Sequence, residues 1–568
     1  MMSAWTRVLG IGALLAGAAR AQTPPSAPAA TSPMLQAMQH ELNRNLTALR
    51  AQPLPPFFLS YEVSEVHSYT IRSTFGAITE DAQHRQRALV VDLRVGTPRL
   101  DNTHAARSDF PDFADVMEMG DRSVDVPIDD DTAALQAVLW TQTDRKYRQA
   151  TRHLASVRAS AAVSVEAEDT APDFSAEPAV QYADTIATQT IDSAAWEAKL
   201  RSYTAPFRRF ADIYDAEATL DAEIETRWYV NSDGTAIVTS QPIDRLYVTA
   251  YSRAKDGMYL PRYESFMAFT LQGLPDDATV LKAVDHMIAD LHRLQAAPVA
   301  DPYTGPAILT GRASAVFFHE VFGHRIEGQR EKREDEGQTF KKAVNQAVLP
   351  PGLSVYSDPT LSRLGATDLA GFYRYDDEGV AARRVTVVQN GILKNFLMSR
   401  SPIEGFSHSN GHGRSQVGLT PVARQSNLIV EAARPRTHAQ LKAMLIAEIK
   451  RQHKPYGLLF DDIEGGFTIT GRGEPNAFAV LPIMVYRVYP DGREELVRGV
   501  DFVGTPLTVF SRILAADDQV AVFNGLCGAE SGLVPVSAVS PGVLLAQVEV
   551  QKKPKAADEP PILPAPEN

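Results

Sequence analysis

Cysteine is almost absent from this 568-residue sequence: Cys527 is the only one, so no internal disulfide can form. Basic residues are not in excess either, since 69 acidic residues accompany 56 lysines and arginines and give a net charge of -13. That charge argues against a nucleic-acid partner, whose phosphates require basic side chains. Beyond the N-terminus no stretch of about 20 apolar residues occurs, so we expect no membrane span in the mature chain.

The N-terminus has the pattern of a secretory signal peptide. Arg7 supplies a positive charge, Val8 to Ala19 is a run of small and aliphatic residues, and Ala19-Arg20-Ala21 fits a small-x-small cleavage site. We predict a signal peptide over residues 1–21, cleaved before Gln22, and export to the periplasm or out of the cell. An uncleaved anchor is the alternative.

The predicted export implies that the sulfur of the lone cysteine needs protection, because a free thiol in an oxidising compartment is readily oxidised. Burial of Cys527 as a small hydrophobic side chain would protect the sulfur, and so would a bound metal. The cysteine alone leaves both interpretations open.

The length exceeds that of a single hydrophobic core, so at least two domains are expected. Composition and periodicity divide the chain into parts that differ in order and in secondary structure. We predict a disordered linker over 22–33, a mixed α/β N-terminal domain over 34–297, a C-terminal domain over 298–552 and a disordered tail over 553–568.

Within the first domain the apolar spacing predicts helices and strands in alternation. The helices are expected at 34–49, 135–162, 194–214 and 281–294, and the strands at 57–75, 88–95 and through 218–253. In the second domain we expect helices at 311–323 and 437–450, and strands at 385–389, 392–397, 426–431, 467–470, 477–489 and 495–500. The fold class is therefore α+β, with a mostly antiparallel β C-terminal domain on which the metal-binding helix packs.

Residues 319–324 read His-Glu-Val-Phe-Gly-His, and with Cys527 they provide two imidazoles, a carboxylate and a thiolate. Zinc binds His nitrogen and Cys sulfur, and a catalytic zinc has three protein ligands and a fourth position for water. A glutamate beside a ligand histidine, here Glu320, can act as general base on that water. The combination predicts a zinc-dependent hydrolase.

The spacing of the two histidines is unusual for a helical metal site. Residues four apart share a helix face, whereas His319 and His324 are five apart and differ by about 140°. The helix must be locally widened, for example by a π-bulge, or must end before His324, and Gly323 makes either distortion easy. Glu327 could orient His324, add a ligand oxygen or remain solvated.

Further candidates lie in loops of the same domain. His412 and Arg414 belong to a glycine-containing segment that we interpret as substrate-facing, with Arg414 available to a peptide carboxylate or carbonyl. Asp376 and Asp377, followed by Glu378, could capture a peptide amino terminus or a hard cation, or could form a solvated turn. The sequence has no serine-elbow motif and no glycine loop that would hold phosphate after a strand.

The segment Phe318-His-Glu-Val-Phe-Gly-His-Arg-Ile-Glu-Gly328 resembles the His-Glu-x-x-x-His signature of the TldD/PmbA family of zinc metalloproteases. Later segments agree with that family in order and spacing over roughly residues 300–550. They are Tyr375-Asp-Asp-Glu-Gly379, Asn390-Gly-Ile-Leu-Lys394, Gly411-His-Gly-Arg414, Ile463-Glu-Gly-Gly466 and Gly525-Leu-Cys-Gly528.

The resemblance implies that His319, His324 and Cys527 are zinc ligands and that Glu320 is the general base of peptide-bond hydrolysis. It also implies a dimer that encloses the active sites and admits only unfolded peptides, either a homodimer or a heterodimer with a PmbA-type subunit. This chain retains the histidine motif and so resembles the active, TldD-type subunit. It departs from cytoplasmic members in its signal peptide and long N-terminal body, and in Gln329, where many members have an acid.

Two other functions remain compatible with these residues. One is an exported peptide-binding or assembly protein with a structural zinc, in which Glu327 would have to complete the four-ligand shell. The other is a zinc amidase that acts on cell-envelope material.

Overall fold

Long alternating segments in the first half of the chain build a twisted eight-stranded sheet with the order β3-β2-β1-β6-β7-β5, to which β4 and β8 add at β2 and β7. The computed structural model describes residues 32–104, 124–163, 170–332, 336–471, 478–553, 563 and 566. The strands are β1 (Pro56–Thr74), β2 (Ala77–Thr97), β3 (Leu100–Asp101), β4 (Val124–Asp125), β5 (Gln181–Ala183), β6 (Ile213–Asn231), β7 (Ala236–Arg253) and β8 (Tyr259–Ala268). The predicted signal peptide and nearly all of the predicted linker and tail lie outside the described residues.

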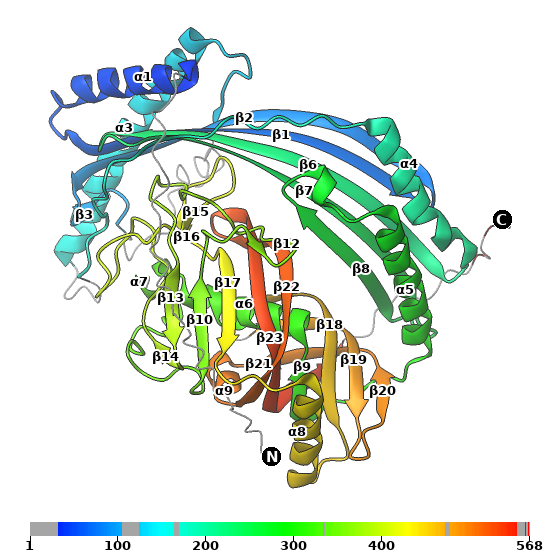
Figure 1. Ribbon diagram of the computed structural model, residues 1–568. Coiled ribbons are helices and arrows are strands. Elements are labelled where there is room, and N and C mark those ends of the chain that lie inside the picture. Colours follow the sequence, from blue (N-terminus) through cyan, green and yellow to red (C-terminus); the bar gives the residue numbers. More distant parts are fainter. Residues whose placement is uncertain are drawn as a thin grey trace, which may run out of the picture.

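Four helices cover one face of this sheet, in two pairs at its opposite ends (Figure 1). They are α1 (Pro33–Leu49) with α3 (Thr132–Val163), and α4 (Ser193–Thr204) with α5 (Asp277–Ala296). Tyr61 and Leu139 lie in the core under the first pair, and Leu220 and Leu291 in the core under the second. Successive side chains of each strand point to opposite faces of the sheet, and the face without these helices is turned toward the C-terminal domain. The sheet arches over that domain (Figure 1).

The helix predicted at 194–214 is shorter than expected. Helix α4 ends at Thr204, the 3-10 turn η1 (Ala205–Arg209) follows, and β6 begins at Ile213. Pro206 lies at the start of η1, where its ring removes a backbone donor and cannot continue the α-helix.

The C-terminal domain is built on an eleven-stranded sheet with the order β14-β13-β10-β17-β23-β21-β19-β18-β9, to which β20 and β22 add. Its strand pairs are antiparallel except β17–β23 and β18–β9, which agrees with the expected mostly antiparallel domain. Its strands are β9 (Tyr303–Leu309), β10 (Leu353–Ser357), β13 (Val385–Gln389), β14 (Ile392–Leu393), β17 (Asn427–Ala432), β18 (Gly457–Thr468), β19 (Phe478–Val488), β20 (Glu494–Val497), β21 (Val500–Gly504), β22 (Ile513–Ala529) and β23 (Gly532–Lys552). Two further two-stranded pairs are β11 (Arg363–Leu364) with β12 (Thr367–Asp368), and β15 (Gly413–Arg414) with β16 (Val422–Ala423).

Helix α6 (Gly311–Val321) carries the histidine motif and is buried against this sheet. Phe317 stacks on Phe502 with ring centroids 5.8 Å apart, and Phe318 contacts Phe510. Every residue of α6 from Ala313 to Val321 is buried, and this close packing holds the last turn of the helix rigidly. The other helices of the domain are α7 (Gln329–Lys332), α8 (His438–Arg451) and α9 (Pro506–Phe510).

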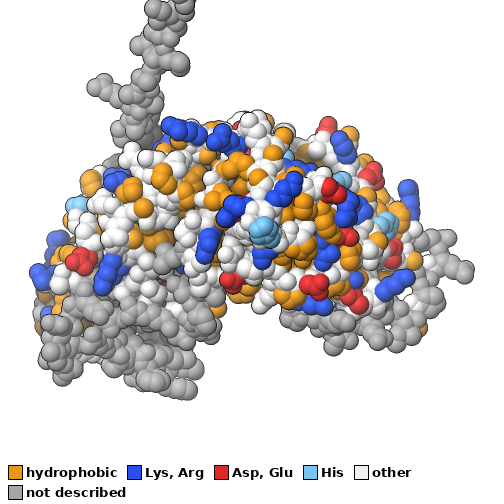
Figure 2. Space-filling view, turned by 90° about the horizontal axis from the view of Figure 1, so that it is seen from below, with side chains coloured by type: hydrophobic (Ala, Val, Ile, Leu, Met, Phe, Trp, Pro, Cys, Tyr) orange, Lys and Arg blue, Asp and Glu red, His pale blue; other side chains and the backbone are white. Residues whose placement is uncertain are grey.

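The described helices include none that is both long and apolar enough to cross a membrane. On the described part of the face shown in Figure 2, basic side chains are scattered among acidic and hydrophobic ones. That distribution offers no continuous basic patch on this face, which agrees with the absence of a basic excess in the sequence.

Buried charges join the two domains at the end of β6. Arg227 is paired with Glu62 of β1 at 3.0 Å, with Asp377 of the C-terminal domain at 3.1 Å and with Glu225. The single guanidinium of Arg227 is thus shared among three carboxylates. Burial raises the pKa of Glu62 to about 7, although the positive charge of Arg227 opposes this shift. Burial raises the pKa of Glu378, which lies in the same region, to about 7 as well.

This cluster predicts that the protein loses stability as pH rises. The pKa of Glu62 is higher in the folded protein than in the unfolded chain, so the folded state binds the Glu62 proton more tightly. This proton binding stabilises the folded state at low pH, and the stabilisation is lost as pH rises through about 7. We expect the free energy of unfolding to fall between pH 5 and 8 by on the order of 2 kcal/mol per such group. Urea unfolding at several pH values measures this slope. Glu62→Gln should flatten it, whereas Glu80→Gln, on the exposed part of the same sheet, should leave it unchanged.

Candidate metal centre

The helix that carries the motif ends before the second histidine. Helix α6 stops at Val321, and His324 lies in the 3-10 turn η3 (Gly323–Ile326). Of the two distortions that the spacing allowed, the structure has the helix end. Gly323 lies at this end and packs closely against Gln425, since a Cβ at position 323 would overlap the side-chain amide of Gln425.

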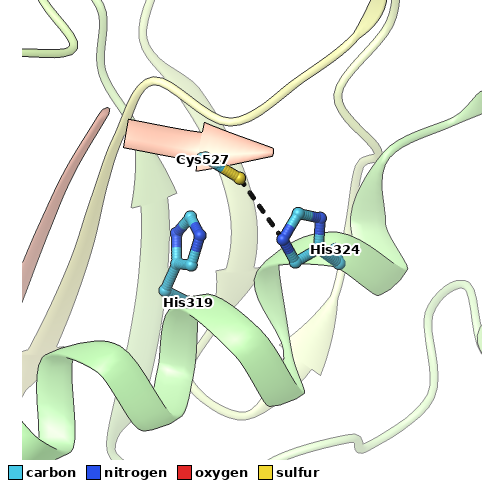
Figure 3. A group of neighbouring side chains, drawn as sticks. All are labelled: His319, His324 and Cys527. Atoms are coloured by element: carbon cyan, nitrogen blue, oxygen red, sulfur yellow. Dashed lines mark hydrogen bonds between the residues drawn. The ribbon is translucent and has the colours of Figure 1, made fainter. Parts of the chain in front are cut away.

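The early end of α6 brings three donor groups together (Figure 3). His319, His324 and Cys527 offer ligand atoms that all lie within 4.8 Å of one another. Nε2 of His324 is 3.3 Å from Sγ of Cys527, and the two imidazole rings are 5.1 Å apart at an interplanar angle of 75°. Cys527 reaches them from β22, which pairs with β23 and places its sulfur above the helix end.

The three side chains fit a zinc ion. All are buried, and Nδ1 of His319 has no hydrogen-bond partner among the described residues, which is costly for a buried polar atom unless a ligand satisfies it. Burial would raise the pKa of the Cys527 thiol, but His324 and His319 beside it hold that pKa well below its usual range. A thiolate with two imidazoles is a donor set that zinc prefers.

Glu327 supports His324 from the side away from the other donors. Its Oε2 is 3.1 Å from Nδ1 of His324 and accepts a hydrogen bond from Nε of Arg330 at 2.9 Å. Burial would raise the pKa of Glu327, but His324 and Arg330 hold it well below its usual range, so the carboxylate stays ionised. This contact fixes which imidazole nitrogen faces Cys527, which is the function expected of a group behind a ligand rather than of a fourth ligand.

We therefore predict that Glu327→Gln weakens zinc binding about 10- to 100-fold, since the amide cannot hold the imidazole as the carboxylate does. Titration with a competing chelator measures this affinity. Glu404→Gln, an exposed change elsewhere in the domain, is the control and should bind zinc as the parent does. Unchanged affinity in Glu327→Gln would contradict the proposed support of His324.

Sequence reasoning missed Arg424 and Gln425, whose hydrogen bonds connect β22 and helix α6 to the segment that precedes β17. Arg424 is fully buried; its Nη2 donates to the carbonyl of Cys527 at 2.6 Å, and its Nε is 3.5 Å from Oε1 of Glu327. Nε2 of Gln425 donates to the carbonyl of His319 at 3.3 Å. The available signal was a run of four polar residues, Arg424 to Asn427, directly before an apolar strand, all of them fully buried in the structure.

Glu320 is positioned at the edge of the donor group. Its Oε2 is 4.0 Å from Nε2 of His324, and it retains some exposure at 9%. Gly466 of β18 lies against it, and a Cβ there would be only 2.8 Å from Cγ of Glu320. The backbone of β18 therefore defines the direction in which this carboxylate points.

This contact predicts a loss of catalysis in Gly466→Ala with zinc retained, because the new methyl group displaces the Glu320 carboxylate without touching the three donors. We expect kcat to fall by at least about tenfold, since small displacements of a catalytic group are costly. The neighbouring Gly465→Ala is a matched control: its added Cβ meets nothing within 4 Å, and activity should be kept. Equal activity of the two variants would show that β18 does not orient Glu320.

The other predicted site residues lie in a second buried network. Nη1 of Arg414 donates to the carbonyls of Gln425 and Pro535, and Nδ1 and Nε2 of His412 contact Asn410 and Ser357. Burial lowers the pKa of His412 to about 3, so it is a neutral structural group.

The acidic turn is also buried rather than solvated. Asp376 accepts hydrogen bonds from the backbone of Val380 and Gly413, and Asp377 accepts one from Ser415 and pairs with Arg227. These contacts shape the loop beneath the site and join the domains. The three donors of the metal cluster do not include either carboxylate.

Comparison with known proteins agrees with this architecture. A family model described as the PmbA/TldA metallopeptidase C-terminal domain matches residues 302–552. A metalloprotease of Archaeoglobus fulgidus is 29% identical over 244 residues, 42% of this chain and 51% of that protein. A zinc metalloprotease TldD homolog of Saccharolobus solfataricus is 23% identical over 260 residues, 44% of this chain and 52% of that protein. The chain thus spans about half the length of the curated relatives it matches.

The fold is shared over a longer range. The crystal structure of TldE from Thermococcus kodakarensis superposes with a TM-score of 0.57 and 13% identity, covering 91% of this chain and 100% of that chain. At this identity the likeness shows the fold alone, and it confirms the α+β class expected from the sequence.

Proposed function

We propose, from the match of its residues 302–552 to the PmbA/TldA metallopeptidase C-terminal domain, that the chain is a zinc-dependent peptidase of the TldD/PmbA type that cleaves unfolded peptides. The observation that carries the proposal is the convergence of His319, His324 and Cys527 beside the carboxylate of Glu320. Glu327 lies behind His324, which supports a site with three protein ligands and an open position, as in catalytic zinc centres.

In this proposal, one group of residues binds the metal and another residue transfers protons. His319, His324 and Cys527 would hold a zinc ion, and that ion would supply Lewis acidity toward a peptide carbonyl and water. Glu320 accepts the proton of the attacking water and passes it to the leaving amine. The burial of the three donors keeps bulk water away and strengthens each of these electrostatic interactions.

The direct test is metal analysis of the purified mature protein together with cleavage of a random pool of unstructured peptides. We expect close to one zinc per chain, cleavage that stops with a chelator, and cleavage that returns with added zinc. A stable folded protein without zinc, or a pool that stays intact in the presence of zinc, would refute the peptidase. Cleavage of cell-envelope amides in place of peptides would favour the amidase.

We further propose that the active form is a dimer. Large apolar side chains are exposed close to the donors: Leu526 on β22, Leu533 on β23 and Phe467 on β18 are about half exposed. Such side chains beside an active site mark an interaction surface. Light scattering of the purified chain, alone and mixed with a PmbA-type subunit, distinguishes a homodimer from a heterodimer, and a monomer under both conditions would refute the proposal.

Export, which residues 1–21 predict, also belongs to the proposed function. Mass spectrometry of the protein from the periplasmic fraction should give a chain that begins at Gln22. An unprocessed chain in the cytoplasm would refute export.

A further inference from the structure

A cleft of about 440 Å³ lies between the two domains, next to the metal centre. Strands β7 and β8 of the N-terminal sheet form one wall, and residues of β18 and β22 form the other. Gly525 and Leu526 in this wall directly precede Cys527, and Glu464 stands two residues before Gly466, which contacts Glu320. The cleft and the metal centre thus share the strands β18 and β22.

Aromatic rings of the N-terminal sheet line one wall. Alternation places Tyr247 and Tyr251 of β7 on the same face, and Tyr259 of β8 packs against Tyr251 with ring centroids 5.1 Å apart. Tyr263 anchors the wall, since its hydroxyl donates to the carbonyl of Ile463 in β18 at 2.7 Å. The aromatic wall is thus fixed relative to the C-terminal domain.

Two carboxylates accompany these rings, one from each domain. Asp215 on β6 is opposite Tyr251 in the sheet register, and Glu464 projects from β18. Neither forms an ion pair or a side-chain hydrogen bond with the described residues. Burial raises the pKa of Tyr259, and Glu464 and Asp215 raise it further, so both carboxylates act on the same ring.

The basic groups near this wall are engaged elsewhere. Arg262 pairs with Asp462 and with Asp290 at 3.2 Å, and Arg253 donates to the carbonyl of Gly257. Arg262 also lines the cleft, and Arg253 acts on Tyr259 against Glu464 and Asp215. The cleft therefore combines aromatic faces with two carboxylates, Asp215 and Glu464, that form no ion pair with a described residue.

We propose that this cleft binds a lysine or arginine side chain of the peptide substrate and gives the enzyme a preference for basic peptides. The proposal rests on the proposed peptidase function. A cation is attracted to aromatic faces and to carboxylates, while the aliphatic stem of the side chain packs against apolar surface such as that of Leu526. The volume of the cleft is sufficient for such a side chain and part of the neighbouring peptide backbone.

Binding to the zinc-loaded, full-length Glu320→Gln variant tests the cleft without requiring hydrolysis. The probes are two fluorescently labelled, unstructured peptides that are identical except that each lysine is replaced by norleucine, which keeps the stem and removes the charge. We expect the lysine peptide to bind about tenfold more tightly, the sum of a cation–π contact and two partly screened ion pairs. Adding Asp215→Asn and Glu464→Gln should lower the ratio of the two Kd values to the smaller preference that the cation–π contact alone gives, whereas adding Glu404→Gln should not change it.

Equal affinities for the two peptides in the parent variant, or a preference that the double change leaves undiminished, would overturn the proposal. The outcome is separate from that of the peptidase assay. A protein that binds the lysine peptide through Asp215 and Glu464 but cleaves no peptide keeps the cleft and refutes hydrolysis. A protein that cleaves peptides without regard to charge keeps hydrolysis and refutes the cleft.

Discussion

Glu320→Gln should retain zinc and lose peptide hydrolysis. The amide has nearly the shape of the carboxylate, so the packing against Gly466 and the three donors 319, 324 and 527 are preserved. It cannot accept a proton from water, and general-base catalysis of this kind contributes about 10²- to 10⁴-fold to rate. We expect kcat to fall by that factor in a steady-state assay of a quenched peptide, with zinc content unchanged by metal analysis.

The pH profile makes the assignment of Glu320 more specific. Residual activity of the variant should lose the acidic limb of the kcat profile, because that limb reports the base. A variant that keeps more than about a tenth of the parent kcat at full zinc occupancy would remove Glu320 from the proton-transfer step.

Cys527→Ala should lose zinc and with it all activity. Removal of a group that only supports a ligand costs about 10- to 100-fold in metal affinity, so removal of a ligand itself should cost more than about 100-fold. Metal analysis after dialysis against a weak chelator should show an essentially zinc-free variant. High concentrations of added zinc should restore only part of the activity, because two imidazoles remain.

Loss of packing must be separated from loss of the ligand. Cys527 is buried in a small cluster with Val534 and Val536. Val534→Ala removes buried apolar volume from the same cluster without removing a donor, so it should lower the unfolding temperature and keep zinc. A Cys527→Ala variant with normal zinc content would show that the sulfur is buried only as a hydrophobic group.

The local features of the site were predictable because they depend on residues close in sequence. The five-residue spacing of His319 and His324 required a helix end or a bulge, and the structure has the helix end. Asn390-Gly391 likewise marked the turn between β13 and β14, where both residues have positive φ.

The strands that deliver Cys527 were not predicted, for physical reasons. Strand β23 contains Pro535 and Pro541, which normally argue against a strand inside a sheet, and β22 contains an acidic stretch at Asp517 that breaks the alternation. Pairing between these two long strands overrides both signals. The strand predicted at 467–470 is the end of β18, whose glycines at 465 and 466 hide its earlier part.

The buried contacts of Arg424 and Glu327 could not be inferred either, because the two residues are far apart in the chain. The expectation that Asp376 and Arg414 face solvent or substrate failed for the same reason: tertiary contacts with Gly413 and Pro535 decide where these polar groups go. Sequence patterns report the face of an element, but not which distant element covers it.

The metal centre is completed by the last long hairpin of the chain, since Cys527 lies 203 residues after His324. Synthesis therefore delivers both histidines well before the third donor, and the site has its full set of donors only after β22 and β23 have joined the sheet. A zinc ion that binds all three groups closes this long loop and favours the joined state over any state in which the hairpin is detached. Because of this order of residues along the chain, the proposed hydrolytic activity should arise only in a molecule whose C-terminal strands have finished folding.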